Sequence, residues 1–233
     1  MRMPAADEID VRGDSTYLHV TTNETIGGIR LPDLPSVDVP LVSDMSSDFL
    51  SRAIDWDVHD LVYGGAQKNL GPAGLAVVVV RRDRLSGHGR NLASYLDYAT
   101  HEANDSMANT PPMFAIYVMG KVLRWMQAEG GLGEFERRAA ERASLVYGAI
   151  DGSDGWYTCP VDVASRSHMN IVFRLPDEDL EKRFAAEAAD AGMVNLKGHR
   201  SVGGIRASVY NAMPVASVET LADFMGSFRA ANG

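Results

Sequence analysis

Four short β-prone runs near the start of the chain constrain its fold most strongly. Turn-forming residues separate these runs, which are Thr16–Thr22, Val39–Ser43, His59–Tyr63 and Leu75–Val80. Short, continuous, Val-rich runs are typical of strands that are covered on both faces in α/β domains. Between the second and third runs, Ser46 or Ser47 is placed to cap a short helix that includes Phe49 and Leu50. We therefore predict that a parallel or mixed sheet frames the first half of the chain.

A long helical pattern begins after the paired prolines Pro111 and Pro112. Apolar side chains recur at helical spacing over Met113–Gln127, and proline is well tolerated in the first turn of a helix. The cluster Gly130–Gly133 is expected to end this helix, and a second helix is predicted over Glu134–Tyr147.

The last third of the chain alternates strand and helix patterns. The predicted elements are a strand at Met169–Leu175, a helix at Asp177–Ala191, a strand at Ile205–Tyr210 and a helix at Ser217–Arg229. Either Asp177 or Pro176 is expected at the start of the first of these helices. This order predicts a small α+β domain, so we place the domain boundary at the glycine cluster, between residues 1–130 and 131–233.

Composition narrows the class of protein. The 233 residues carry a formal net charge of -9, which argues against nucleic acid as a partner because phosphate contacts depend on basic surface. The single Cys159 cannot form an internal disulfide or a multi-thiolate metal site, which favours a cytoplasmic location. No secretory signal is expected in Met1–Asp10. The longest apolar run, Leu75–Val80, is too short for a membrane span.

One basic segment stands out in this acidic chain. No acidic residue occurs from Ala191 to Val218, whereas Lys197, His199, Arg200 and Arg206 all lie there. A solvated loop explains such a segment as readily as an anion site does. Two arginines close to a histidine nevertheless suit carboxylate or phosphate, because guanidinium groups bind such oxygens in pairs.

Lys68 is the most informative of the four lysines. Lys121 and Lys182 fall in predicted amphipathic helices, where an exposed face explains them. Lys68 lies in a small-residue turn, Tyr63–Gly74, between two predicted buried strands, and functional groups gather at such strand ends in α/β sheets. A lysine there is positioned to form an imine with a carbonyl compound. From spacing alone, a solvent-exposed loop lysine stays the simpler alternative.

Five segments in order resemble the phosphoserine aminotransferases, a class V, fold-type I aminotransferase family that uses pyridoxal 5'-phosphate. The segments are Asn23–Ile26, Val42–Ser47, Gly65–Gly74, Ser106–Pro112 and Gly198–Ser208. The resemblance extends from about Tyr17 to the closing helix. It implies an α/β fold with a partial large domain, built on a mixed, mostly parallel sheet, and a small C-terminal α+β domain. It also implies that the N-terminal third of the family's length is missing here.

The resemblance assigns roles around the cofactor. Lys68 matches the catalytic residue that links covalently to pyridoxal phosphate and then moves the substrate proton. Asp44 matches the carboxylate that keeps the pyridine nitrogen protonated, although a capping role would also explain an Asp beside Ser. Thr25 matches the hydroxyl near the ring oxygen of the cofactor, and Gln67 matches a contact to its phosphate.

The resemblance also implies a homodimer with a shared active site. Asn109 and Thr110 match the pair that reaches the cofactor phosphate of the neighbouring subunit, while Thr110 could equally cap the following helix. Arg206 matches the residue that holds the α-carboxylate of the substrate. His199 and Arg200 match the residues that bind the substrate phosphate, across the dimer interface.

The implied reaction transfers an amino group reversibly between O-phospho-L-serine with 2-oxoglutarate and 3-phosphohydroxypyruvate with L-glutamate. Serine biosynthesis is the family's main role, and a role in pyridoxine biosynthesis is open. Two alternatives remain: an inactive remnant that assembles only with a complete subunit, and another class V enzyme such as an alanine:glyoxylate aminotransferase or a cysteine desulfurase. The last needs a nucleophilic cysteine, whereas Cys159 lies in an apolar context that favours a structural role.

Overall fold

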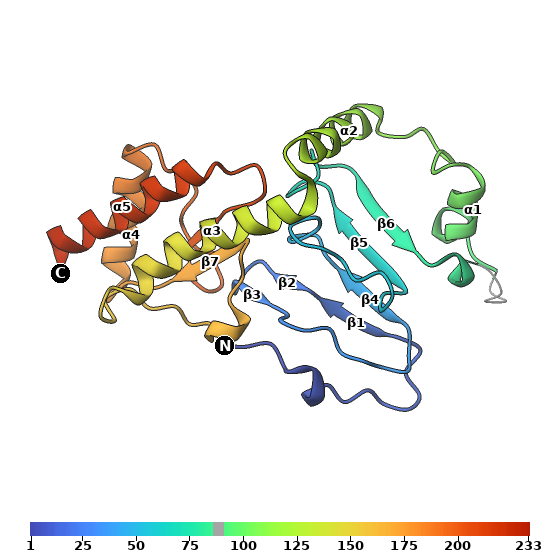
Figure 1. The fold of residues 1–233 in the computed structure, drawn as a ribbon, viewed down its shortest axis with the longest axis horizontal. Helices are drawn as coiled ribbons and strands as arrows, with labels where there is room; N and C mark the ends of the chain where they lie inside the picture. The colour runs from blue at the N-terminus through green and yellow to red at the C-terminus, as the bar shows by residue number, and fades with distance from the viewer. Residues whose placement is uncertain (86–90) are drawn as a thin grey trace.

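The computed structural model describes residues 1–85 and 91–233, which form two lobes (Figure 1). The sheet lobe holds four strands in the order β1-β4-β5-β6, namely Leu18–Thr21, Leu41–Asp44, Leu61–Gly65 and Ala76–Val80. The first three strands are parallel, and β6 runs antiparallel to β5. The four predicted strands and the mixed sheet are therefore confirmed.

A two-stranded hairpin, which the sequence patterns did not predict, follows β1. It pairs β2 (Asn23–Glu24) with β3 (Ile29–Arg30). The Glu24 carboxylate accepts the backbone N–H of Ile26, and Gly28 has a φ of 68° that favours glycine. A Cβ at Gly28 would lie 2.6 Å from the backbone oxygen of Asn170, so glycine also permits the hairpin to approach the C-terminal lobe closely.

The predicted short helix after β4 is wrong, because residues 46–50 form a turn. The Ser47 hydroxyl does not cap a helix here. It donates to the backbone oxygen of Asn23 and accepts from the Asn23 side chain. Leu50 then adopts a φ of 55°, a left-handed conformation that ends the turn.

Five α-helices complete the described chain, together with four single-turn helices. The α-helices are α1 (Tyr98–Ala103), α2 (Met113–Ala128), α3 (Gly131–Asp151), α4 (Glu178–Asp190) and α5 (Val215–Asn232). The single turns are η1 (Ala6–Glu8), η2 (Arg82–Arg84), η3 (Ser94–Leu96) and η4 (Val163–Ser165). The four long helices were predicted, and α1 was not. None of the described helices is long and apolar enough to cross a membrane.

Two predicted helix ends differ from the structure. The helix α2 is preceded by Pro112 without a side-chain cap, so the capping alternative for Thr110 is wrong. Helix α2 ends at Ala128, before the glycine cluster, and Gly130, which has a φ of 113°, precedes α3, to which Gly131–Gly133 already belong. Helix α3 runs from the sheet lobe into the C-terminal lobe (Figure 1), and the domain division at this point stays a prediction.

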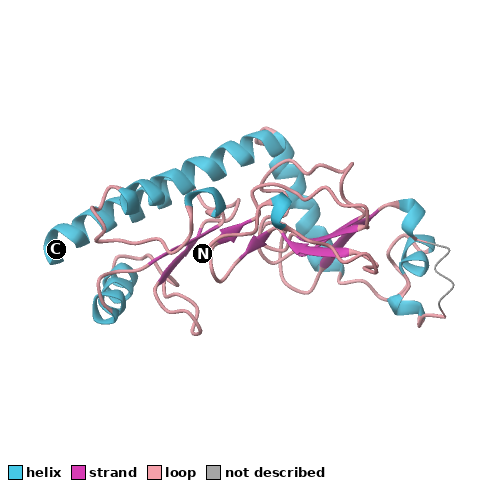
Figure 2. Ribbon diagram, turned by 90° about the horizontal axis from the view of Figure 1, so that it is seen from below, coloured by secondary structure: helices cyan, strands magenta, loops and turns pink. Residues whose placement is uncertain are grey.

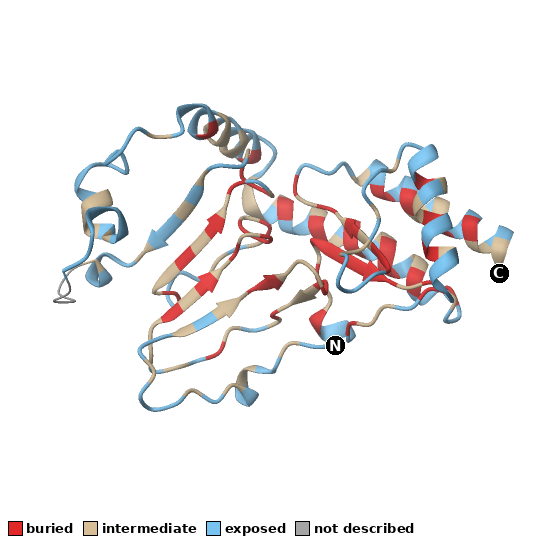
Figure 3. Ribbon diagram, turned by 180° about the vertical axis from the view of Figure 1, so that it is seen from behind, coloured by how far each residue is buried: buried red, intermediate tan, exposed pale blue. Residues whose placement is uncertain are grey.

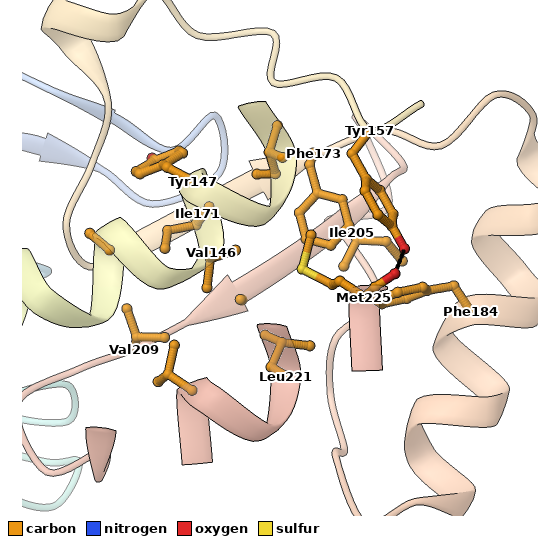
Figure 4. Packing of buried hydrophobic residues seen from close by; sticks show 14 of the residues in the cluster. Val146, Tyr147, Tyr157, Ile171, Phe173, Phe184, Ile205, Val209, Leu221 and Met225 are labelled. Carbon is orange, nitrogen blue, oxygen red and sulfur yellow. Dashed lines mark hydrogen bonds between the residues drawn. The ribbon is translucent and has the colours of Figure 1, made fainter. Parts of the chain in front are cut away.

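The C-terminal lobe is built on an antiparallel pair, β7 (Asn170–Phe173) and β8 (Ile205–Ser208). One face of the pair packs on α3, α4 and α5 through Ile171, Phe173 and Ile205, which belong to the larger buried apolar cluster (Figure 4). The opposite face presents Asn170 beside Ser208, because paired residues in an antiparallel sheet share a face. Strand β7 therefore has one face toward the apolar core and a second, also buried, face that carries the polar side chain of Asn170. Figure 2 shows the strands along the middle of the molecule with helices on both sides.

We expect the conservative change Ile171→Val to lower the free energy of unfolding by about 0.5–1.5 kcal/mol. The Ile171 side chain is completely buried in the core, so the lost methylene group leaves a small void. Chemical denaturation followed by circular dichroism measures the change. Val163→Ala, at an exposed position, is the control and should leave stability nearly unchanged. An equal loss in both variants would contradict the assignment of the core.

Apolar side chains are exposed on α2 and on the edge strand β6 (Figure 3). Met113 and Phe114 are 78% and 74% exposed, and Tyr117 lies open beside them. The opposite side of α2 packs through Met119 and Leu123 on the smaller apolar cluster of the sheet lobe. One face of α2 thus holds the sheet lobe, while the other is an apolar surface without a covering element among the described residues.

Candidate active site

The turn that follows β5 places Lys68 at the end of the sheet. The backbone N–H groups of Leu70 and Gly71 both donate to the oxygen of Ala66, which closes the turn. The Lys68 Nζ donates a hydrogen bond of 2.6 Å to the Thr25 Oγ1, at the tip of the β2–β3 hairpin. The half-buried Lys68 amine therefore points toward the hairpin.

Burial lowers the pKa of Lys68 below its ordinary value of 10.5. The nearby Asp44 carboxylate opposes this change in the pKa, and the Arg206 guanidinium adds to it. No salt bridge joins Lys68 to a carboxylate in residues 1–85 and 91–233. A lysine of lowered pKa holds more of its amine unprotonated, which is the form that attacks a carbonyl group. A hydrogen bond thus joins Lys68 to Thr25, and the charges of Asp44 and Arg206 both act on the Lys68 amine.

Asp44 ends β4 beside two residues that sequence reasoning missed. Its Oδ1 accepts the backbone N–H of Ser46 at 2.8 Å, so it caps the turn that follows β4. Tyr63 is its partner on β5, and burial followed by the Asp44 charge raises the pKa of the Tyr63 hydroxyl. The Nε2 of His19, on β1, lies 3.0 Å from that hydroxyl. Only the strand order β1-β4-β5 brings these three side chains together.

Arg206 occupies the polar face of β8. Its Nε is buried and has no hydrogen-bond partner among the residues that the structure describes. A buried guanidinium N–H without a partner is costly, so this group is suited to an anion supplied by a ligand. The combination of an imine-forming amine, a carboxylate and an unpartnered guanidinium fits a carbonyl cofactor together with a carboxylate substrate.

The segment after α4 carries the other predicted anion-binding residues. Arg200 is exposed and lines a cavity of about 560 Å³ together with Lys197 and Arg174. Arg206 does not line this cavity, so the two candidate anion groups lie at different places. The Nδ1 of His199 lies 2.7 Å from the Ser201 hydroxyl.

Glycine is required where this segment folds back on itself. A Cβ at Gly198 would lie 2.0 Å from the backbone oxygen of Gly203. The Gly204 N–H donates to Glu181 at 3.1 Å, and Arg174 donates to the Val202 oxygen at 3.0 Å. These contacts fix the backbone that carries His199 and Arg200.

Three predicted cofactor residues are not brought to Lys68 by contacts in the described chain. Gln67 is exposed and folds over Gly65. Asn109 and Thr110 are exposed before α2, where the Asn109 side chain donates to the Thr110 backbone oxygen. Their roles stay predictions.

Cys159 packs against the core of the C-terminal lobe, and burial raises the pKa of its thiol. A raised pKa disfavours the nucleophilic thiolate. This supports a structural role for Cys159.

Comparisons with known proteins agree on one family. The family described as "Aminotransferase class-V" matches residues 4–221. A protein named phosphoserine aminotransferase from Laribacter hongkongensis is 51% identical over 231 residues, which cover 99% of this chain and 64% of the relative.

Two solved structures are similar in fold as well as in sequence. The phosphoserine aminotransferase from Bacillus circulans subsp. alkalophilus superposes with a TM-score of 0.97 at 49% identity, covering all of this chain and 65% of that one. The phosphoserine aminotransferase from Trichomonas vaginalis, described as PLP-bound, gives a TM-score of 0.91 at 37% identity, covering 97% of this chain and 64% of that one. The present chain thus spans slightly less than two thirds of the length of these relatives.

Proposed function

This chain belongs to the class-V aminotransferase family. We propose that it functions as part of a pyridoxal 5'-phosphate-dependent phosphoserine aminotransferase. The reaction would be amino transfer between O-phospho-L-serine with 2-oxoglutarate and 3-phosphohydroxypyruvate with L-glutamate, in serine biosynthesis. The observation that carries this proposal is the Lys68 amine, which donates a hydrogen bond to Thr25 and whose pKa is lowered by burial, with the charges of Asp44 and Arg206 acting on it.

The residues present suit pyridoxal phosphate. When bound, this cofactor supplies an aldehyde and an electron-accepting ring. Lys68 would hold it covalently, with Thr25 beside the ring oxygen and Asp44 beside the ring nitrogen. Gln67 would contact the cofactor phosphate, and Asn109 with Thr110 would reach the phosphate in a second subunit.

Each side chain contributes a distinct physical step. Thr25 orients the Lys68 Nζ through their hydrogen bond, and the unprotonated amine can take the proton from the substrate Cα. The negative charge of Asp44 stabilises a positive charge at the end of β4. Arg206 holds the substrate α-carboxylate through its free guanidinium N–H groups.

Substrate selection is assigned to the basic segment. Both amino donors, phosphoserine and glutamate, carry a second anion besides the α-carboxylate. His199 and Arg200 lie on the segment held by Glu181 and Arg174, where a phosphate or a side-chain carboxylate can meet positive charge.

We expect Arg200→Ala to lower kcat/KM for phosphoserine by about tenfold to a hundredfold, and to lower it less for glutamate. The phosphate carries more charge than a carboxylate and loses more when the guanidinium is removed. Steady-state kinetics with each amino donor measures the difference. Arg183→Ala, on the exposed face of α4, is the matched control and should change neither value. An equal loss with both donors would contradict the phosphate role of Arg200.

A homodimer with a shared active site is also part of this proposal. The exposed apolar face of α2, which follows directly after Asn109 and Thr110, supports a second copy of the chain as its occupant. Sedimentation analysis of the parent chain and of the Phe114→Glu variant tests whether the chain forms a dimer through this face of α2. A cytoplasmic location and a second role in pyridoxine biosynthesis stay predictions.

A further inference from the structure

A buried pair of amides joins the two lobes. The Asn23 Nδ2 donates to the Asn170 Oδ1 at 3.0 Å, although 147 residues separate them in sequence. Asn23 is 2% exposed and Asn170 is fully buried. The Asn23 side chain makes two further hydrogen bonds. Its Nδ2 donates to the Ser47 hydroxyl, and its Oδ1 accepts from the Ser167 hydroxyl. Buried amides without such partners would be costly, so the network is specific as well as stable.

From Asn170 the network continues to the strand that carries Arg206. The Asn170 Nδ2 donates to the Ser208 hydroxyl at 3.1 Å and to the Tyr210 hydroxyl at 3.0 Å. Ser208 is two residues from Arg206, and alternation along β8 places both side chains on the polar face. Asn170 thus contacts Ser208, which follows Arg206 on the same side of β8, and Tyr210, which lies two residues beyond the end of the strand.

From Asn23 the network leads to the amine. Asn23 begins the hairpin whose tip carries Thr25, the hydrogen-bond partner of Lys68. The hairpin is held against the C-terminal lobe by a second contact, in which the Ser167 N–H donates to the Gly28 oxygen at 3.0 Å.

A further hydrogen bond between the lobes involves Asn69 and Asn211. Asn69, the neighbour of Lys68, accepts the backbone N–H of Asn211 at 3.0 Å through its Oδ1. The Asn211 Nδ2 donates to the Leu50 oxygen at 2.9 Å. The residue that follows Lys68 and the turn after β4 are therefore both hydrogen-bonded to Asn211, which follows β8.

We propose that Asn170 is a positioning residue for Arg206, and that the Asn23–Asn170 pair fixes the separation of Arg206 from Lys68. Apolar contacts between lobes allow sliding, whereas directional hydrogen bonds between buried amides define one arrangement. The carboxylate-binding group is thus already in place before substrate arrives. This inference rests on the proposed function, which makes Arg206 the ligand of the α-carboxylate.

The kinetic test uses the full chain with added pyridoxal phosphate. Asn170→Ala should raise KM by about tenfold for phosphoserine and by the same factor for glutamate, with a smaller change in kcat. The same rise in KM is expected for both amino donors because both carry the α-carboxylate. Tyr210→Phe, which removes one hydroxyl group, should raise KM less, and the double variant should add little to Asn170→Ala.

The control is Leu221→Ala, which opens the core of the C-terminal lobe without touching its polar face. A purely structural role predicts that Asn170→Ala lowers the melting temperature and leaves KM unchanged, and this result would overturn the proposal. An equal rise in KM in the Leu221→Ala variant would overturn it as well.

Calorimetric titration with glutarate, a dicarboxylate without an amino group, separates this inference from the proposed function. Asn170→Ala should weaken glutarate binding about tenfold, and Arg206→Ala should abolish it. If the parent chain binds glutarate and transfers no amino group, the proposed function fails, and weaker binding in Asn170→Ala still supports the positioning role. The positioning role of Asn170 is overturned if Asn170→Ala binds glutarate with unchanged affinity, or if the parent chain binds no glutarate.

Discussion

We expect Lys68→Ala to lower the rate of amino transfer by about 10⁴-fold or more, because the same amine holds the cofactor and moves the substrate proton. No other lysine is recorded at the end of the sheet in the described residues. The neighbouring Thr25 hydroxyl cannot replace the amine, since it forms no imine with an aldehyde. Steady-state assays with phosphoserine and 2-oxoglutarate measure the loss.

A second readout does not depend on turnover. The parent chain should bind pyridoxal phosphate covalently, so that reduction with borohydride adds the cofactor mass to the peptide that contains Lys68. The variant should show no such addition. Lys182→Ala removes an exposed lysine of α4 and should leave the labelling of the Lys68 peptide unchanged. Covalent cofactor on another lysine of the parent chain would contradict the assignment of Lys68.

We expect Asp44→Asn to lower kcat by about 10²–10³-fold, the usual loss when a single electrostatic contact to the reacting group is removed. The amide keeps the oxygen that accepts the Ser46 N–H, so the turn is preserved. Only the negative charge is lost. The substitution should therefore lower kcat while the melting temperature stays close to that of the parent chain.

The same variant has a predictable pH dependence. The Asp44 charge raises the pKa of Lys68, so its removal lowers that pKa further below 10.5. The pH midpoint for covalent capture of pyridoxal phosphate should shift to a lower value, because the amine loses its proton more readily. The matched control is Asp38→Asn, which changes an exposed carboxylate that precedes the N-terminal end of β4. A shift to higher pH would contradict the proximity of Asp44 to Lys68.

Local pattern predicted the regular elements well. The Val-rich run that became β6 and the apolar periodicity of α2 arise from neighbouring residues, so a single sequence contains the signal. The turn at Ser46–Leu50 was mistaken for a helix because its Ser47 hydroxyl is occupied by Asn23, which lies 24 residues away. Tertiary partners of this kind override a local capping pattern.

The candidate site likewise contains some residues that were predicted from the sequence and others that were not. The resemblance singled out Lys68 and Asp44, and the structure places them near each other. His19 and Tyr63 were missed because their proximity depends on the order of strands in the sheet. Asn170 was missed for a stronger reason, since a buried asparagine in a strand has no sequence signal until its partner, 147 residues earlier, is known.

The two faces of β7 place different requirements on successive residues. Ile171 and Phe173 face the apolar core, whereas Asn170 and Val172 face the hairpin and the polar side of β8. Substitutions at Ile171 and Phe173 should therefore act through the amount of folded protein, whereas substitutions at Asn170 should also change the activity of each folded molecule. Neighbouring positions of one strand, Asn170 and Ile171, thus affect specific activity and abundance to different extents.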